Sequence, residues 1–213
     1  MKVRDTTTNQ DTNQRRCWAI PGEKQALTAV WDKHPERKLA LKLMFDGGLR
    51  SREVPKITAA DFERETTPDG EPIWRLRIQD GKTGSRTTVV PESVADLAFT
   101  LKNTLGFDER TAIINKTPRT IQNWVTWAAE HAGGYDGTRD RSDPSAWTQP
   151  DYRHFSAHDC RRTWATHLVH SGVPESVVMS WGGWRDYSTF SEHYYGEETA
   201  ERTADYLARA GMK

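Results

Sequence analysis

The chain has 213 residues, with 30 Lys and Arg against 30 Asp and Glu, 35% hydrophobic residues and a mean hydropathy of -0.82. This composition is typical of one globular domain that can bury a sizeable core. No apolar run approaches the ~18 residues of a membrane span, and the polar start carries no secretory signal, so we expect a cytoplasmic protein. The balanced charge does not by itself indicate a nucleic-acid partner.

The two cysteines, Cys17 and Cys160, are too few and too far apart in sequence for a disulfide scaffold or a metal cluster. The histidines are scattered without the spacing of metal ligands. The sequence therefore predicts no metal site and fits a reducing compartment.

The first half of the chain predicts a leader, two helices and a hairpin. Residues 1–20 are almost wholly polar at their start, which predicts a disordered leader. From Pro21, apolar residues at helical spacing predict two short helices before Gly47 and Gly48. Apolar and polar residues then alternate over 74–79, and β-branched residues follow the turn at 80–84, which predicts a β-hairpin with Lys82 in its turn.

The second half predicts further helices around a long loop. Thr117 followed by a proline opens a helix, and the polar stretch 133–153 is expected to be a surface loop. Ser156 and Asp159 form a capping box, so we expect a helix over 158–171. A short helix after Pro174 and a last helix over 189–210 complete the prediction. The predicted fold class is α+β, mostly α-helical with a small antiparallel sheet, and we expect residues 21–213 to form one domain.

Several residues of the types that bind phosphate groups or take part in phosphoryl transfer are spread along the chain. Arg50 and Glu53 are three apart, so the carboxylate can orient the guanidinium, and His158 and Arg161 share one face at the start of the capped helix. Each pair alone is more often a surface feature, and Lys82 alone is a solubilising lysine. Two arginines, a lysine and a histidine that converge could nevertheless serve a metal-free phosphodiester reaction.

In order along the chain, these segments resemble the tyrosine recombinases, also called the phage integrase family. Residues 48–53, Gly-Leu-Arg-x-x-Glu, are similar to the family's first arginine motif, and residues 158–167 resemble its His-x-x-Arg box. Residues 181–184, Trp-Gly-Gly-Trp, resemble its Leu-Gly-His/Trp segment, and residues 192–194, Glu-His-Tyr, resemble the terminal tyrosine motif. The resemblance runs from about residue 21 to the end and implies the catalytic-domain fold of that family.

The resemblance implies a role for each matching residue. Arg50 and Arg161 would stabilise the pentavalent phosphate, and Lys82 would be the general acid toward the 5′ oxygen. Tyr194 would form a 3′-phosphotyrosyl link, with the adjacent Tyr195 as the alternative nucleophile.

Three further points follow from the same resemblance. His158 and Trp184 would contact the phosphate and the nucleophile, and Glu53 would order Arg50. No metal and no nucleotide cofactor is implied. The short leader would not supply the N-terminal core-binding domain of the family, so we expect a minimal catalytic domain or a fragment.

The implied function is site-specific recombination of double-stranded DNA, in which strands are cleaved, exchanged and rejoined. Alternatives are a catalytically weak DNA-binding regulator that keeps the fold, an activity like that of type IB topoisomerases, and a metal-free nuclease. The resemblance also implies a homo-oligomer, a synaptic tetramer on DNA, that forms through the C-terminal helix. The acidic residues of this helix fit a protein interface or a solvated face equally well; they are Glu192, Glu197, Glu198, Glu201 and Asp205.

Overall fold

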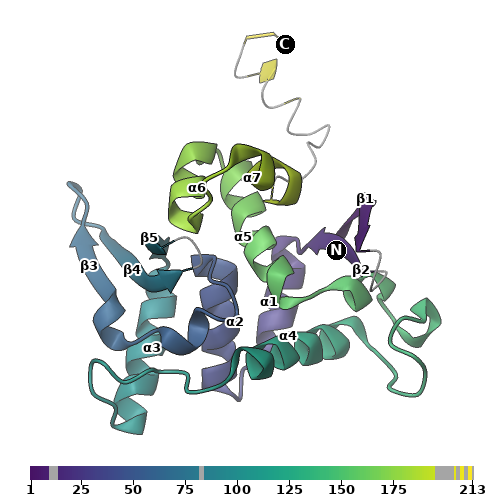
Figure 1. Ribbon diagram of the computed structural model, residues 1–213, viewed down its shortest axis with the longest axis horizontal. Helices are drawn as coiled ribbons and strands as arrows, with labels where there is room; N and C mark the ends of the chain where they lie inside the picture. Colours follow the sequence, from purple (N-terminus) through teal and green to yellow (C-terminus); the bar gives the residue numbers. More distant parts are fainter. Residues whose placement is uncertain (10–13, 82–83, 195–203, 205–206, 209–210, 213) are drawn as a thin grey trace.

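The computed structural model describes residues 1–9, 14–81, 84–194, 204, 207–208 and 211–212 (Figure 1). The α-helices are α1 (Pro21–Ala29), α2 (Pro35–Gly47), α3 (Glu92–Leu105), α4 (Pro118–Gly133), α5 (Ala157–His170), α6 (Glu175–Gly182) and α7 (Tyr187–Tyr194). Short 3-10 turns are η1 (Val54–Lys56), η2 (Ala59–Asp61), η3 (Pro144–Ala146) and η4 (Pro150–His154). The strands are β1 (Lys2–Asn9), β2 (Gln14–Trp18), β3 (Phe62–Thr66), β4 (Pro72–Gly81) and β5 (Gly84–Val90).

The three-stranded sheet has the order β3-β4-β5 and is antiparallel throughout, with Leu76 paired to Phe62 on one side and to Thr88 on the other. The predicted hairpin is therefore confirmed as β4 and β5. Its turn, including Lys82, lies outside the described residues. Alternation along β5 buries Arg86, Thr88 and Val90, while Thr87 is exposed.

The start of the chain differs from the predicted disordered leader, because β1 and β2 pair antiparallel, from Lys2 opposite Trp18 to Asn9 opposite Gln14. The end of β2 and the segment that follows it are attached to α5. The Cys17 N–H donates to Asp159 Oδ1 (3.3 Å), and the Ala19 N–H donates to Thr163 Oγ1 (2.9 Å). These partners are far away in sequence, so the composition of the leader gives no sign of them.

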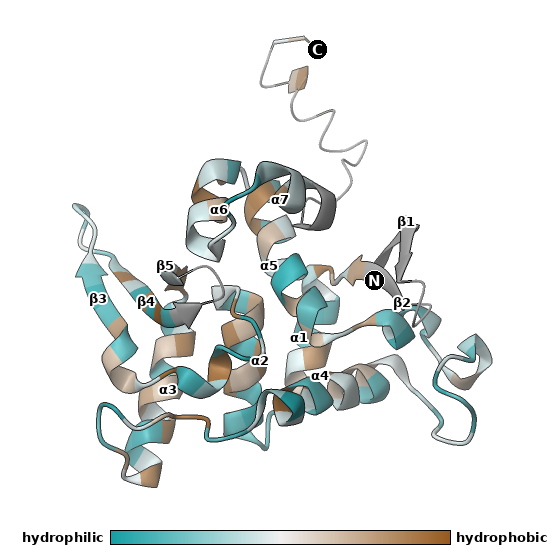
Figure 2. Ribbon diagram, in the orientation of Figure 1, coloured by the Kyte–Doolittle hydropathy of each residue, from teal (hydrophilic) through white to brown (hydrophobic). Residues whose placement is uncertain are grey.

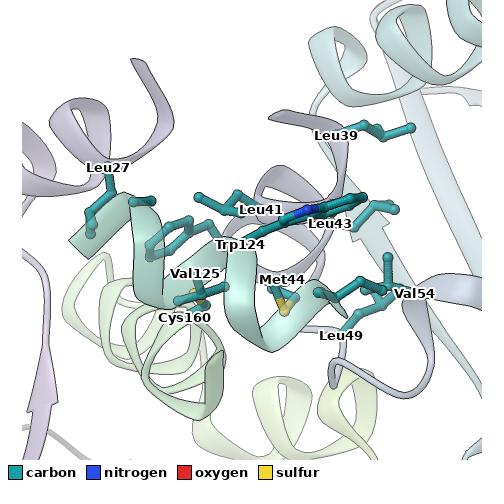
Figure 3. Close-up of a cluster of buried hydrophobic side chains, with 14 of the residues drawn as sticks. Leu27, Leu39, Leu41, Leu43, Met44, Leu49, Val54, Trp124, Val125 and Cys160 are labelled. Carbon is teal, nitrogen blue, oxygen red and sulfur yellow. The ribbon is translucent and has the colours of Figure 1, made fainter. Parts of the chain in front are cut away.

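Two groups of buried side chains stabilise the fold. The larger core cluster involves α1 to α5 and the sheet, and Figure 3 shows part of it, with Leu41 and Leu43 of α2 near Trp124 and Val125 of α4. Hydrophobic and hydrophilic residues alternate along α2, α3 and α4 in Figure 2, as expected for helices with one buried face. The smaller core cluster consists of Trp164, Ala165, Val169, Val178, Trp184 and Phe190.

The small cluster joins α6 and α7 to the second half of α5, and these two helices lie at one end of the molecule (Figure 1). The capping box predicted for α5 is confirmed: the Ser156 N–H and hydroxyl donate to Asp159 Oδ2 at 2.9 and 2.6 Å. The predicted last helix corresponds to α7 up to Tyr194, and residues 195–203 lie outside the described part. No described helix is long and apolar enough to cross a membrane. The architecture confirms the predicted α+β class.

Candidate active site

An open pocket of about 490 Å³ lies between the loop after α2, the first turns of α4 and the start of α5. Its walls are formed by Arg50, Ser51, Arg52, Pro118, Arg119, Gln122, Thr126, Ser156, Ala157, His158 and Arg161. None of these lining residues is acidic, and four are arginines. The pocket therefore suits an anion.

A tight turn at the end of α2 positions Arg50. Gly48 adopts a left-handed conformation with φ of 67°, and a Cβ there would lie 2.4 Å from the ring of Trp164. Only glycine fits both the backbone angle and this close approach. The chain then buries Leu49 completely and brings Arg50, whose side chain is 16% exposed, to the pocket.

Glu53 lies behind Arg50 and is 1% exposed. It accepts the backbone N–H of Arg50 at 2.8 Å and Arg50 Nη1 at 2.9 Å. Arg86 Nη1 and Nη2 donate to Oε1 and Oε2 at 2.9 and 2.7 Å. Burial raises the pKa of Glu53, but the hydrogen bonds and charges of Arg86 and Arg50 outweigh it and lower the pKa to about 2. Glu53 is therefore ionised at neutral pH.

Arg161 borders the pocket but is itself completely buried. Its Nη1 donates to the carbonyl oxygen of Gly48 and its Nη2 to that of Gly182. Its Cζ lies 3.9 Å from the centroid of the Trp184 ring, a cation–π contact. The guanidinium thus connects the end of α2 with the end of α6.

The structure brings Arg50, His158 and Arg161 to one pocket. His158 is exposed and lies in the first turn of α5, one helical turn before Arg161. Trp184 contacts Arg161 of this group, and Glu53 contacts Arg50. Of the remaining predicted residues, Lys82 and Tyr195 lie outside the described part of the chain.

Tyr194 is the last residue of α7. This helix begins after Asp186, whose carboxylate accepts the Ser188 and Thr189 hydroxyls at 2.7 and 2.8 Å and the backbone N–H groups of both residues at 3.2 Å. These bonds lower the pKa of Asp186 to about 2. Phe190 anchors α7, since it is fully buried with its ring 5.1 Å from that of Trp184.

Sequence reasoning missed several residues at this site. Arg52, Arg119 and Gln122 line the pocket, and Gln122 Nε2 donates to Ser51 Oγ at 3.2 Å. Arg86 is 8% exposed and is the second cation on Glu53. Its position in the sequence could have indicated burial, because Arg86 lies two residues before the buried Thr88 and therefore on the same face of β5. Within the described ranges, no cluster of three or more His, Cys, Asp or Glu side chains could hold a metal ion.

Comparison with solved structures places the fold among recombinases and integrases. XerA recombinase superposes with a TM-score of 0.68 at 13% identity, covering 91% of this chain and 65% of that one. XerH recombinase in a post-cleavage DNA complex gives 0.64 at 17% identity, with 95% and 55% covered. The integrase of mycobacterium phage Brujita gives 0.53 at 19% identity, with 91% and 59% covered.

This chain therefore spans about two thirds of XerA recombinase and a smaller part of the other two. A search of curated proteins finds no significant match. A family model described as the phage integrase family matches residues 23–201. Since this match covers most of a chain whose fold is that of the tyrosine recombinase catalytic domain, the protein belongs to the phage integrase family.

Proposed function

We propose that the chain is a site-specific DNA recombinase that works through a covalent 3′-phosphotyrosyl intermediate. One observation carries this proposal: Arg50, His158 and Arg161 come from distant segments yet line a single basic pocket. Guanidinium groups bind the non-bridging oxygens of a phosphodiester and stabilise the charge that grows on them in the transition state.

In this mechanism the scissile phosphate enters the pocket beside Arg50. Arg161 is fully buried, so binding includes a movement that opens the pocket toward its guanidinium. His158, in the first turn of α5, donates to a phosphate oxygen, and the helix N-terminus favours the same negative charge. Trp184 holds Arg161 through the contact with its ring.

The hydroxyl oxygen of Tyr194 attacks phosphorus, releases its proton to solvent and forms the phosphotyrosyl bond. The bond to the 5′ oxygen breaks, and Lys82 supplies the proton that this oxygen takes up. A freed 5′ hydroxyl of a partner strand then attacks the phosphotyrosine, releases Tyr194 and restores a phosphodiester. Tyr194, Tyr195 as its alternative, and Lys82 are assigned by their match to the family motifs.

The proposed partners are double-stranded DNA and further copies of this chain. Two of the similar structures, XerH recombinase and the Tn1549 transposon integrase, were solved in complex with DNA. We propose that residues 21–213 act as the catalytic domain. The C-terminal segment that follows α7 would contact a neighbouring protomer in a synaptic tetramer.

Covalent trapping tests the proposal. Nicked duplexes, from which the cleaved piece diffuses away, are prepared from DNA that flanks the gene and incubated with the wild type, Tyr194→Phe and Tyr195→Phe. Tyr187→Phe is the matched control, because Tyr187 begins the same helix and is 56% exposed. We expect a covalent band with the wild type and with Tyr187→Phe, and none with Tyr194→Phe.

Other outcomes lead to different conclusions. Loss of the band in Tyr195→Phe alone would keep the function and move the nucleophile by one residue. Binding of these duplexes without any covalent band would favour the DNA-binding regulator. On intact duplexes, cleavage with rejoining but no exchange between two duplexes would favour a topoisomerase-like activity.

A further inference from the structure

Glu53 is shared by two arginines, whose guanidinium groups and one backbone N–H together occupy all of its acceptor positions. A carboxylate offers about four lone-pair sites. Glu53 receives four hydrogen bonds, two from Arg50 and two from Arg86. A third residue cannot be added without displacing one of these donors.

The two arginines use Glu53 differently. Arg86 makes a forked pair in which each Nη meets a different carboxylate oxygen, and its side chain is 5% exposed. Arg50 makes one side-chain bond to Glu53, while the rest of its side chain reaches the pocket. The side chains of Arg50, Glu53 and Arg86 together carry two positive charges and one negative charge. The excess positive charge lies on the side of Arg50, because Arg86 is buried against the carboxylate.

We propose that Arg86 is the counter-ion of Glu53 and a positioning residue for Arg50, so that Glu53 orients Arg50 without neutralising the charge that Arg50 offers to the scissile phosphate. This inference rests on the proposed function. Without Arg86, the Glu53 carboxylate would have Arg50 as its sole cation among these contacts. A close pair of opposite charges would then replace a cationic group at the pocket.

A second contact extends the influence of Arg86 to the other arginine. Arg86 Nε donates to the carbonyl oxygen of Trp181 at 3.1 Å. Trp181 lies in the last turn of α6, which leads to Trp184 above the guanidinium of Arg161. One buried side chain on β5 thereby connects the loop that carries Arg50 with the helix end that holds Arg161.

The test measures single-turnover cleavage of a nicked duplex that forms the covalent band with the wild type. Arg86→Met, Arg86→Lys and the double variant Arg86→Met/Glu53→Gln are compared at equal concentrations of folded protein. Arg77→Met is the matched control, because Arg77 lies on the adjacent strand β4, pointing to solvent with 55% of its side chain exposed. It removes an arginine from the same sheet without touching Arg50, Glu53 or Arg86.

We expect Arg86→Met to cleave roughly 100-fold more slowly, the size of effect seen when one transition-state donor is lost. Arg86→Lys keeps the positive charge but not the pair of hydrogen bonds to the two carboxylate oxygens, so its cleavage rate should lie between those of the wild type and Arg86→Met. The double variant should cleave faster than Arg86→Met, because removing the carboxylate charge frees Arg50 again. Arg77→Met should match the wild type.

Two results would overturn the inference. One is a wild-type rate for folded Arg86→Met; the other is a double variant slower than Arg86→Met, which is what a purely structural role predicts. If Arg86→Met does not fold, the same comparison is made between Arg86→Lys and Arg86→Lys/Glu53→Gln.

A readout without DNA separates this inference from the proposed function. The Nε–H resonance of Arg50 in ¹⁵N-labelled protein, assigned with Arg50→Lys, should shift in Arg86→Met and stay in place in Arg77→Met. If the wild type forms no covalent band, the proposed function fails, while this resonance still decides whether Arg86 positions Arg50. An unchanged resonance in Arg86→Met would refute the inference.

Discussion

The guanidinium of Arg161 lies over the indole of Trp184, with its Cζ 3.9 Å from the ring centroid. Desolvated contacts of this kind stabilise by about 2 kcal/mol. The carbonyl oxygens of Gly48 and Gly182 hold the same guanidinium from two sides. Since Trp184 also packs on Phe190, the position of Arg161 depends on the packing of α6 and α7.

Gly182→Ala should disturb this arrangement directly. A Cβ at Gly182 would lie 1.9 Å from Trp184 Cζ3, although the helical backbone there accepts alanine. We expect a loss of about 1–3 kcal/mol in the free energy of unfolding, as for other overpacked cores, and slower covalent trapping. Urea unfolding measures the first effect. Gly22→Ala in α1 is the control, because apart from its chain neighbours and its own helix backbone no atom lies within 4 Å of a Cβ there; equal losses in both variants would contradict the explanation.

The buried Glu53 should make stability depend on acid pH. Its pKa is lowered from 4.5 to about 2, so the folded protein binds its proton less readily than the unfolded chain. The ionised Glu53 therefore adds on the order of 3 kcal/mol to the free energy of unfolding. This stabilisation is present above pH 4.5 and is lost as the pH falls toward 2. Urea unfolding from pH 7 to pH 3 should show a smaller decline for Glu53→Gln than for the wild type. Parallel curves would show that Glu53 does not contribute.

Thr163→Val should weaken the attachment of the N-terminal segment. The Thr163 hydroxyl accepts the buried N–H of Ala19, and valine has a similar shape without an acceptor. An unsatisfied buried N–H costs about 1–3 kcal/mol, so urea unfolding should show a loss of this size. Thr87→Val on β5 replaces an exposed threonine and should change stability little. A similar effect of the two substitutions would contradict the role given to the Ala19 contact.

Asp186→Ala should destabilise α7 locally. It removes the acceptor for the Ser188 and Thr189 groups at the start of this helix. Amide exchange should become faster in α7, and covalent trapping should slow because Tyr194 ends the helix. Asp140→Ala serves as control, since Asp140 makes similar bonds to Ser142 in a loop. Unchanged exchange in α7 would rule out Asp186 as the residue that starts it.

Local signals made much of the fold predictable. The capping box of α5 and the β4–β5 hairpin depend on residues close in sequence, and both were predicted from them. The strands at the start of the chain were not, because Cys17 and Ala19 are held by Asp159 and Thr163, more than a hundred positions away. Arg86 was missed for a similar reason, since its partner Glu53 lies on another segment. The sequence of a strand does not indicate which carboxylate an arginine in it will contact, because that depends on where the strand packs in the fold.

The division of the buried side chains into two clusters has a consequence for motion. Among the described residues, the smaller cluster contains six buried side chains and the larger one many more, so we expect the local free energy of opening of the smaller cluster to be lower. It contains Trp184 and Phe190, whereas Arg50 follows α2, whose buried side chains belong to the larger cluster. We therefore expect the helix that ends at Tyr194 to open locally at a lower cost in free energy than the loop that carries Arg50, a difference that amide exchange would measure.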